Sequence, residues 1–132
     1  MKRSVRTLLL MTSALLMTIV ALGYAFVVVP DLHGDLVEIG VRPTVLGGTV
    51  MHLYFGGIAR FGFALIVWIA AIQAMRGVVI ARLPLAVVAI VYTAFGILAF
   101  SRSHNPHHLG PLVAGVLLGA AVISGGTDTS AS

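Results

Sequence analysis

Four apolar runs, each near the length of a membrane-spanning helix, constrain the fold of this chain more than any other feature. They lie at about 7–29, 45–73, 83–100 and 109–123. About 20 predominantly apolar residues cross a bilayer as a helix, whereas barrel strands are shorter and alternate in polarity, which these runs do not. Because a helix satisfies its own backbone hydrogen bonds in lipid, we predict an all-α polytopic membrane protein, a four-transmembrane-helix bundle within residues 1–124.

Composition supports this class and excludes others. Hydrophobic residues make up 59% of the chain and charged residues 9%, beyond the roughly 45–50% apolar content of soluble domains. The chain has no cysteine, which excludes disulfides, thiolate metal sites and cysteine nucleophiles. No basic face with aromatic readers suggests nucleic-acid binding. The Gly-, Ser- and Thr-rich end, Gly125–Ser132, is predicted to be a disordered tail.

The positions of the basic residues predict an orientation. Lys2, Arg3 and Arg6 precede the first run, and Arg76 and Arg82 flank the connection between the second and third. By the positive-inside rule, these segments lie in the cytoplasm. We therefore expect a multi-pass protein of the bacterial inner membrane with both termini cytoplasmic.

The first run also fits a second interpretation, a cleaved signal peptide. Basic residues precede its apolar stretch, and Gly23-Tyr24-Ala25 resembles a signal-peptidase site. However, the apolar run continues beyond that point to Pro30, which is too long for a typical signal core. We favour a spanning helix that ends at Pro30, since proline interrupts helices.

The two connections expected on the outer side, 30–44 and 101–108, hold most of the ionisable side chains. Nitrogen and oxygen ligands of this kind suit zinc or another borderline divalent ion. The histidines have no helical spacing that would fix a metal geometry, so a solvated or headgroup-contacting loop is the alternative. The metal-ligand candidates, which would act with the acids of the first connection, are His33, His104, His107 and His108.

The second run carries a polar face. Gly48, His52, Gly56 and Arg60 recur every four residues and therefore share one side of a helix. A charge at mid-helix costs roughly 2.5 kcal/mol or more in hydrocarbon, so Arg60 is expected to face the bundle interior. Small residues allow close helix packing, and the glycines have that simpler interpretation. For Arg60 the alternatives are snorkelling or a structural ion pair.

These residues suggest two functions. The first is an outward-facing pocket that binds an anionic or amphipathic small molecule, a lipid or a partner helix, with ligand-binding candidates His52, Arg60, Arg102, Tyr54 and Tyr92. The second is an intramembrane enzyme that performs acid/base chemistry on a lipophilic substrate, with His52, Asp35 or Glu38 as the catalytic group. Both tyrosines also fit as ordinary bundle or interfacial aromatics. No nucleophile or nucleotide-binding motif supports an enzyme class, and no cofactor is indicated.

A resemblance supports the architecture. Pro30, the sequence Tyr54-Phe55-Gly56-Gly57, Gly96 and Arg102 occur in an order that resembles a family of small bacterial four-helix integral membrane proteins catalogued as a domain of unknown function. The similarity extends over roughly Gly23 to Val122. It implies a four-helix fold and no known activity. A membrane partner or a homo-oligomer is compatible with such a small bundle.

Overall fold

The computed structural model describes residues 2–125, and these are almost entirely helical. The segments are α1 (Lys2–Gly23), the π-helical η1 (Tyr24–Val28), α2 (Val29–Glu38), α3 (Pro43–Arg76), α4 (Arg82–Ser103), the 3₁₀-helical η2 (Pro106–His108) and α5 (Leu109–Ser124). Four helical stretches are long and apolar enough to cross a membrane: Ser4–Glu38, Pro43–Arg76, Arg82–Ser103 and Pro106–Ser124. The predicted all-α class with four such helices is confirmed at this level.

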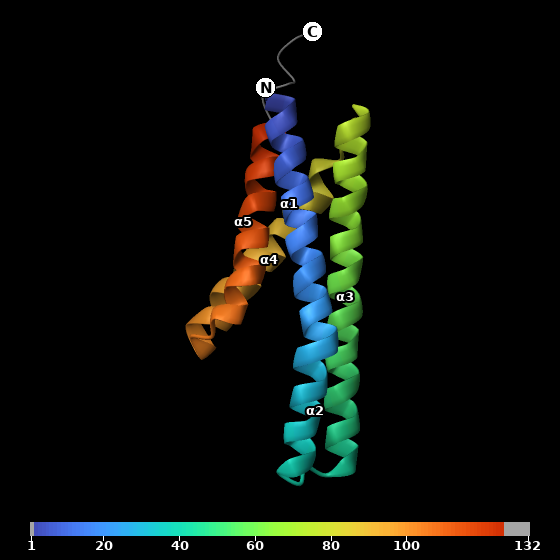
Figure 1. The fold of residues 1–132 in the computed structure, drawn as a ribbon, viewed down its shortest axis with the longest axis vertical. Helices are drawn as coiled ribbons and strands as arrows, with labels where there is room; N and C mark the ends of the chain where they lie inside the picture. The colour runs from blue at the N-terminus through green and yellow to red at the C-terminus, as the bar shows by residue number, and fades with distance from the viewer. Residues whose placement is uncertain (1, 126–132) are drawn as a thin grey trace.

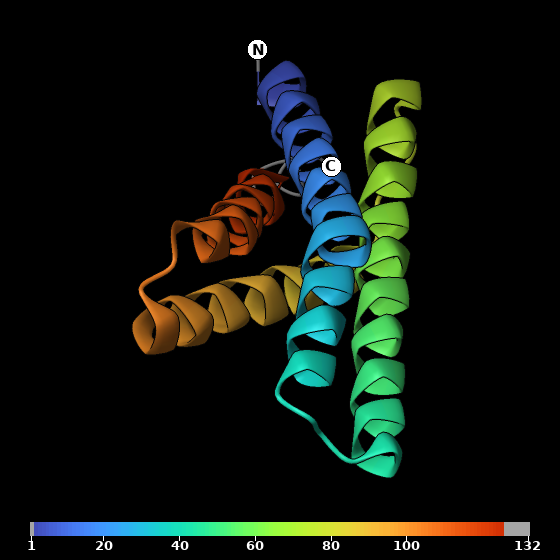
Figure 2. The same cartoon turned by 60° about the horizontal axis from the view of Figure 1, so that its bottom comes forward.

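The helices form two hairpins that diverge from one another. The longer hairpin pairs the continuous rod α1–η1–α2 with α3, and the shorter pairs α4 with α5 (Figure 1). α5 packs against α1, whereas α3 and α4 make little contact. In a second view, the corner where α4 meets α5 stands to one side of the long hairpin, apart from α2 (Figure 2). The bundle is therefore closed at one end and open between α3 and α4 at the other.

The closed end contains the core. Leu10, Met17, Val67, Leu85 and Leu118 are fully or almost fully buried there. Most of the remaining buried side chains are small: Ala14, Ala64, Ala70, Ala71, Ala74, Ala89, Ala114 and Ala121. Small side chains let neighbouring backbones approach closely, which is the usual means of helix association in lipid.

Two further contacts define the closed end. Trp68 Nε1 donates a hydrogen bond of 3.0 Å to Thr18 Oγ1, joining α3 to α1. Arg82 Nη2 donates to the carbonyl oxygen of Gly125, and the Arg6 guanidinium also lies beside Gly125. The start of α1, the start of α4 and the end of α5 thus lie together, which agrees with the predicted grouping of basic segments on one side.

The first helix does not end at Pro30, contrary to the prediction. It continues to Glu38, because the α-helix becomes the wider π-helix η1 just before the proline. There Val29 N–H donates to the carbonyl of Tyr24, five residues back instead of four. A proline has no N–H and clashes with the carbonyl four residues earlier, and the wider π turn accommodates both defects.

This extension changes the outer connections. Asp31, His33, Asp35 and Glu38 lie on exposed positions of α2 instead of in a loop, and only residues 39–42 connect α2 to α3. The ends of the other three predicted spans lie within about three residues of the ends of α3, α4 and α5. Gly125, predicted to begin the tail, is buried and follows α5 directly. The remainder of the predicted tail, residues 126–132, lies outside the described residues.

The long hairpin exceeds the thickness of a bilayer core. At 1.5 Å per residue, a 35-residue rod is about 50 Å long, whereas the hydrocarbon region is about 30 Å thick. The shorter α4–α5 hairpin matches that thickness more closely. In a membrane, the long hairpin must therefore tilt or extend beyond the hydrocarbon at its α2 end.

Candidate functional site

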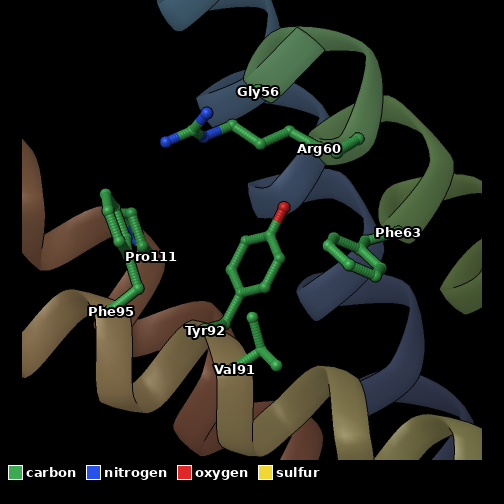
Figure 3. A pocket seen from close by; sticks show the side chains of 8 residues that line it. Gly56, Arg60, Phe63, Val91, Tyr92, Phe95 and Pro111 are labelled. Carbon is green, nitrogen blue, oxygen red and sulfur yellow. The ribbon is translucent and has the colours of Figure 1, made fainter. Parts of the chain in front are cut away.

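A cavity of about 190 Å³ lies between α3 and α4, where the two hairpins diverge. We refer to it as the Arg60 cavity. Its lining residues are Gly56, Ala59, Arg60 and Phe63 from α3, Val91, Tyr92 and Phe95 from α4, and Pro111 from α5 (Figure 3). Apart from Arg60 and Tyr92, every lining side chain is apolar or absent. The cavity thus combines an apolar wall with two polar groups.

The Arg60 side chain is held by aromatic rings. Its guanidinium carbon lies 3.7 Å from the centroid of the Tyr24 ring and 5.3 Å from that of Phe95. Contacts of this type contribute about 0.5–2 kcal/mol, and more when water is excluded. Stacking on a ring face occupies the flat side of the guanidinium and leaves the N–H groups at its edge available.

Two glycines of α3 lie against this stack. A Cβ atom at Gly56 would lie 3.1 Å from Arg60 Nη1 and 3.5 Å from Tyr24 Oη. At Gly57 it would lie 3.7 Å from Cδ1 of the Tyr24 ring. The glycine pair of α3 therefore provides the surface on which Tyr24 rests, and Gly56 leaves room for the guanidinium one turn before Arg60.

The π turn belongs to the site. Tyr24 is its first residue, and the turn changes the rotational register of the rod before α2 begins. The sequence feature behind it is Pro30, six residues later. The proline that was predicted to end the first helix is thus associated with the turn that supplies the aromatic support of Arg60.

Tyr92 is the second polar group of the cavity. Its side chain is only 5% exposed, and its hydroxyl has no hydrogen-bond partner among the described residues. Figure 3 shows this oxygen directed toward the side of the cavity that Arg60 crosses. The ring packs edge-on against Phe63, with centroids 6.1 Å apart. An unsatisfied buried hydroxyl costs about 1–3 kcal/mol, and a ligand atom that accepted its hydrogen bond would remove that cost.

The protein places no negative charge beside these groups within residues 2–125. The acids in that range, Asp31, Asp35 and Glu38, are exposed on α2, and none lines the cavity. The guanidinium therefore sits at an apolar cavity with aromatic contacts as its support. In lipid, a cation in that situation attracts a counter-anion strongly, because the surrounding dielectric is low.

Three of the predicted ligand-binding residues lie elsewhere. His52 is exposed, and its Nδ1 donates a 2.7 Å hydrogen bond to the carbonyl of Gly48 on its own helix. It does not meet Arg60, because eight residues correspond to about 12 Å along a helix axis. Tyr54 is half exposed and Arg102 lies exposed in the last turn of α4; neither lines the cavity. Arg60 and Tyr92 are the two that come together.

The metal and catalytic candidates do not assemble either. No group of three or more His, Asp or Glu side chains within the described part of the chain could hold a metal ion. His33 lies on the rigid α2, while His104, His107 and His108 lie at the α4–α5 corner, which diverges from it. His108 instead packs edge-on against Phe95, with centroids 6.4 Å apart. Asp35 and Glu38, the acid/base alternatives to His52, are likewise remote from the cavity lining.

Sequence reasoning missed the aromatic support of Arg60 and most of the apolar lining: Tyr24, Ala59, Phe63, Val91, Phe95 and Pro111. Helical spacing offered a partial signal, since Phe63 follows Arg60 by three residues and Phe95 follows Tyr92 by three. Nothing in the spacing of one helix shows which residue of another helix it meets. Tyr24 in particular was noted only as part of a cleavage-like sequence.

Comparison with known proteins gives no match to any family model, curated protein or solved structure.

Proposed function

We propose that this chain is a small integral protein of the bacterial inner membrane that binds an anionic, amphipathic molecule in the Arg60 cavity. The observation that carries this proposal is the Arg60 guanidinium, stacked on Tyr24 beside an apolar cavity that no described acid lines. An anionic group at the guanidinium edge would neutralise the charge. The apolar walls would contact the remainder of the molecule.

The open side of the bundle supports entry from the lipid. α3 and α4 make little contact, and Val91 and Phe95 at the cavity wall are 43% and 40% exposed. In a membrane, this gap faces the hydrocarbon chains. A lipophilic anion can therefore reach Arg60 sideways from the bilayer without crossing the closed end.

The depth of the cavity fits an amphipathic ligand. Arg60 is about 24 Å from Arg76 along the axis of α3, and Pro111 is about 20 Å from the end of α5. If the arginine-rich end lies at the cytoplasmic surface, the cavity lies in the outer part of the roughly 30 Å hydrocarbon region. A polar group there sits just inside the outer interface, with its apolar part still in lipid.

Native mass spectrometry of protein extracted gently from its own membranes tests the binding function. We expect an anionic amphiphile to remain bound to the wild-type chain and to be lost, by at least about tenfold, from Arg60→Leu, because the counter-charge is gone. Arg102→Leu is the matched control, since Arg102 is exposed and lies off the cavity. An identical set of bound molecules in wild type and Arg60→Leu would refute the proposal.

The orientation has its own test. Reporter fusions at Ser132 and within residues 77–81 should both give cytoplasmic signals, because the basic residues Arg6, Arg76 and Arg82 lie at that end of the bundle. A fusion inserted in residues 39–42 should give the opposite signal. An extracytoplasmic signal at Ser132 would contradict the proposed topology.

A further inference from the structure

The hydrogen-bonding groups that line the Arg60 cavity restrict the class of ligand further; this inference rests on the proposed binding function. The guanidinium carries five N–H donors and no acceptor, and the Tyr92 hydroxyl adds one O–H donor. These are the only polar side chains that line the cavity within residues 2–125. The ligand must therefore supply acceptor oxygens and one negative charge.

A carboxylate matches this inventory in both charge and oxygen count. Its single charge is balanced by Arg60, and its two oxygens correspond to the guanidinium edge and the Tyr92 hydroxyl. A phosphate monoester would bring up to two charges and three terminal oxygens, and its second charge would have no counter-charge among the apolar walls. Burial without partners is costly. An alcohol, ester or quinone would supply acceptors but leave Arg60 without a counter-charge.

The cavity volume sets how much of the ligand is enclosed. About 190 Å³ is smaller than the roughly 300–1,000 Å³ of pockets that enclose a whole small molecule. The cavity therefore takes the polar end and the first few carbons. The rest of the molecule must lie in the gap between α3 and α4, against exposed apolar residues such as Val91 and Phe95. This arrangement suits a long apolar chain.

Binding requires a modest movement within the site. The Tyr92 oxygen is covered in this structure, and the long Arg60 side chain crosses the same side of the cavity (Figure 3). Within residues 2–125, Arg60 is held there by contacts with aromatic rings and by no hydrogen bond or ion pair. A carboxylate that draws the guanidinium aside would expose the Tyr92 hydroxyl and accept its hydrogen bond.

We infer that the Arg60 cavity binds the carboxylate end of a lipophilic monocarboxylic acid of the fatty-acid type, with Arg60 pairing with the charge and Tyr92 donating to the second oxygen. The hydroxyl that is unsatisfied in the ligand-free protein then has an acceptor. The acid enters from the bilayer through the gap between α3 and α4.

Chain-matched probes test this inference. The full-length protein in nanodiscs of zwitterionic phosphatidylcholine is titrated with dodecanoic acid, dodecyl phosphate, dodecanol and methyl dodecanoate, with protein-free nanodiscs as the blank. Native mass spectrometry counts the bound probe. We expect the wild-type chain to retain dodecanoate at least about tenfold better than each of the other three. Arg60→Leu should lose this preference entirely.

Tyr92→Phe tests the second donor. It should weaken dodecanoate binding by about tenfold or more, equivalent to about 1.4 kcal/mol or more for one hydrogen bond to a charged group, without changing the weak binding of dodecanol. Tyr54→Phe is the control, because Tyr54 is half exposed on α3 and lies off the cavity. Thermal unfolding of each variant, followed in parallel, shows whether any loss of binding reflects loss of the fold.

The outcomes separate this inference from the function on which it rests. Preference for dodecyl phosphate that depends on Arg60 would overturn the carboxylate assignment and leave anion binding intact. Dodecanoate binding that needs Arg60 but not Tyr92 would overturn the two-donor arrangement. Equal binding of dodecanol and both anions, or no specific binding of any probe, would overturn the inference and the proposed function together.

Discussion

The interface between α4 and α5 is formed around glycines, whereas the gap between α3 and α4 is lined by aromatic rings and one cation. In the first, a Cβ atom at Gly96 would lie 2.7 Å from backbone atoms of Leu112, and one at Gly115 would lie 2.5 Å from Thr93 Oγ1. In the second, Tyr92 and Arg60 border a cavity. Helix α4 thus borders both a closely packed interface and, beside it, a cavity, with Tyr92 one turn before Gly96.

The difference indicates how a small membrane protein combines stability with a binding site. Without a hydrophobic driving force between helices in lipid, close backbone contact supplies much of the association energy. The glycine contacts fix the α4–α5 hairpin. The adjoining surface of α4, which includes Tyr92 one turn before Gly96, lines the cavity and carries the unsatisfied hydroxyl. Stability should therefore respond to the glycine interface, and ligand binding to the gap.

Adding a methyl group at Gly115 or Gly96 should have the largest effect on stability. Gly115→Ala or Gly96→Ala places the new atom against backbone that cannot move aside, and we expect a loss of about 1–3 kcal/mol or more in the free energy of unfolding. Unfolding of detergent-solubilised protein by denaturant measures it.

Gly119→Ala is the matched control for this comparison. It lies on the same helix α5, but its Cβ would meet nothing within 4 Å. Because alanine favours helix over glycine by up to about 1 kcal/mol, this variant should be unchanged or more stable. Equal losses at Gly115 and Gly119 would show that the α4–α5 interface is not closely packed.

The parts of this structure that follow from local pattern were predictable. The lengths of the apolar runs gave the helices, because spanning a bilayer needs about 20 apolar residues regardless of tertiary context. Four-residue spacing placed Gly56 and Arg60 on one face of α3, and the cost of a charge in lipid directed attention to Arg60. These inferences depend on one helix at a time.

The parts that depend on packing between helices were not predictable. Pro30 was expected to end the first helix, because the prediction did not include a π turn able to absorb it. Tyr24 lies in that turn and contacts both Arg60 and the Gly56–Gly57 surface of another helix, which no pattern within one helix indicates. His52 shares a face with Arg60, yet it bonds to its own helix instead of reaching the cavity.

Trp68 tests whether the α1–α3 contact also belongs to the stable part of the molecule. Trp68→Phe removes the hydrogen bond to Thr18 and some buried ring area, and we expect the free energy of unfolding to fall by about 1–2 kcal/mol. Thr18 keeps its own bond to the carbonyl of Ala14, so no buried donor is left unpaired. A double-mutant cycle with Thr18→Val should give a coupling of about 0.6 kcal/mol, the average for such bonds in lipid. A coupling of zero would assign the whole loss to packing.

Arg60→Leu should abolish ligand binding without lowering the free energy of unfolding by more than about 1 kcal/mol. It removes a cation that no described acid balances and keeps the side-chain bulk, so stability should stay within about 1 kcal/mol of wild type or rise, even with the loss of the Tyr24 contact. Denaturant unfolding without added probe measures this. A loss of several kcal/mol would indicate that the contacts of Arg60 with Tyr24 and Phe95 have a structural role, which would undermine the contrast between the packed interface and the gap.

The smallest effect is expected from Tyr92→Phe in the absence of ligand. The change removes a hydroxyl that has no partner among the described residues and retains the ring that packs on Phe63. Because the unsatisfied group is already costly, the unfolding free energy should be unchanged or rise by less than about 1 kcal/mol. Tyr54→Phe, at a half-exposed position, should be unchanged. With dodecanoate in large excess the order should reverse, since a ligand that binds only the folded state stabilises it by an amount that rises with the logarithm of its affinity. Wild type should then be more stable than Tyr92→Phe. If Tyr92→Phe destabilises the ligand-free protein, the hydroxyl contributes to the packed core. The gap between α3 and α4 would then not contain the proposed binding site.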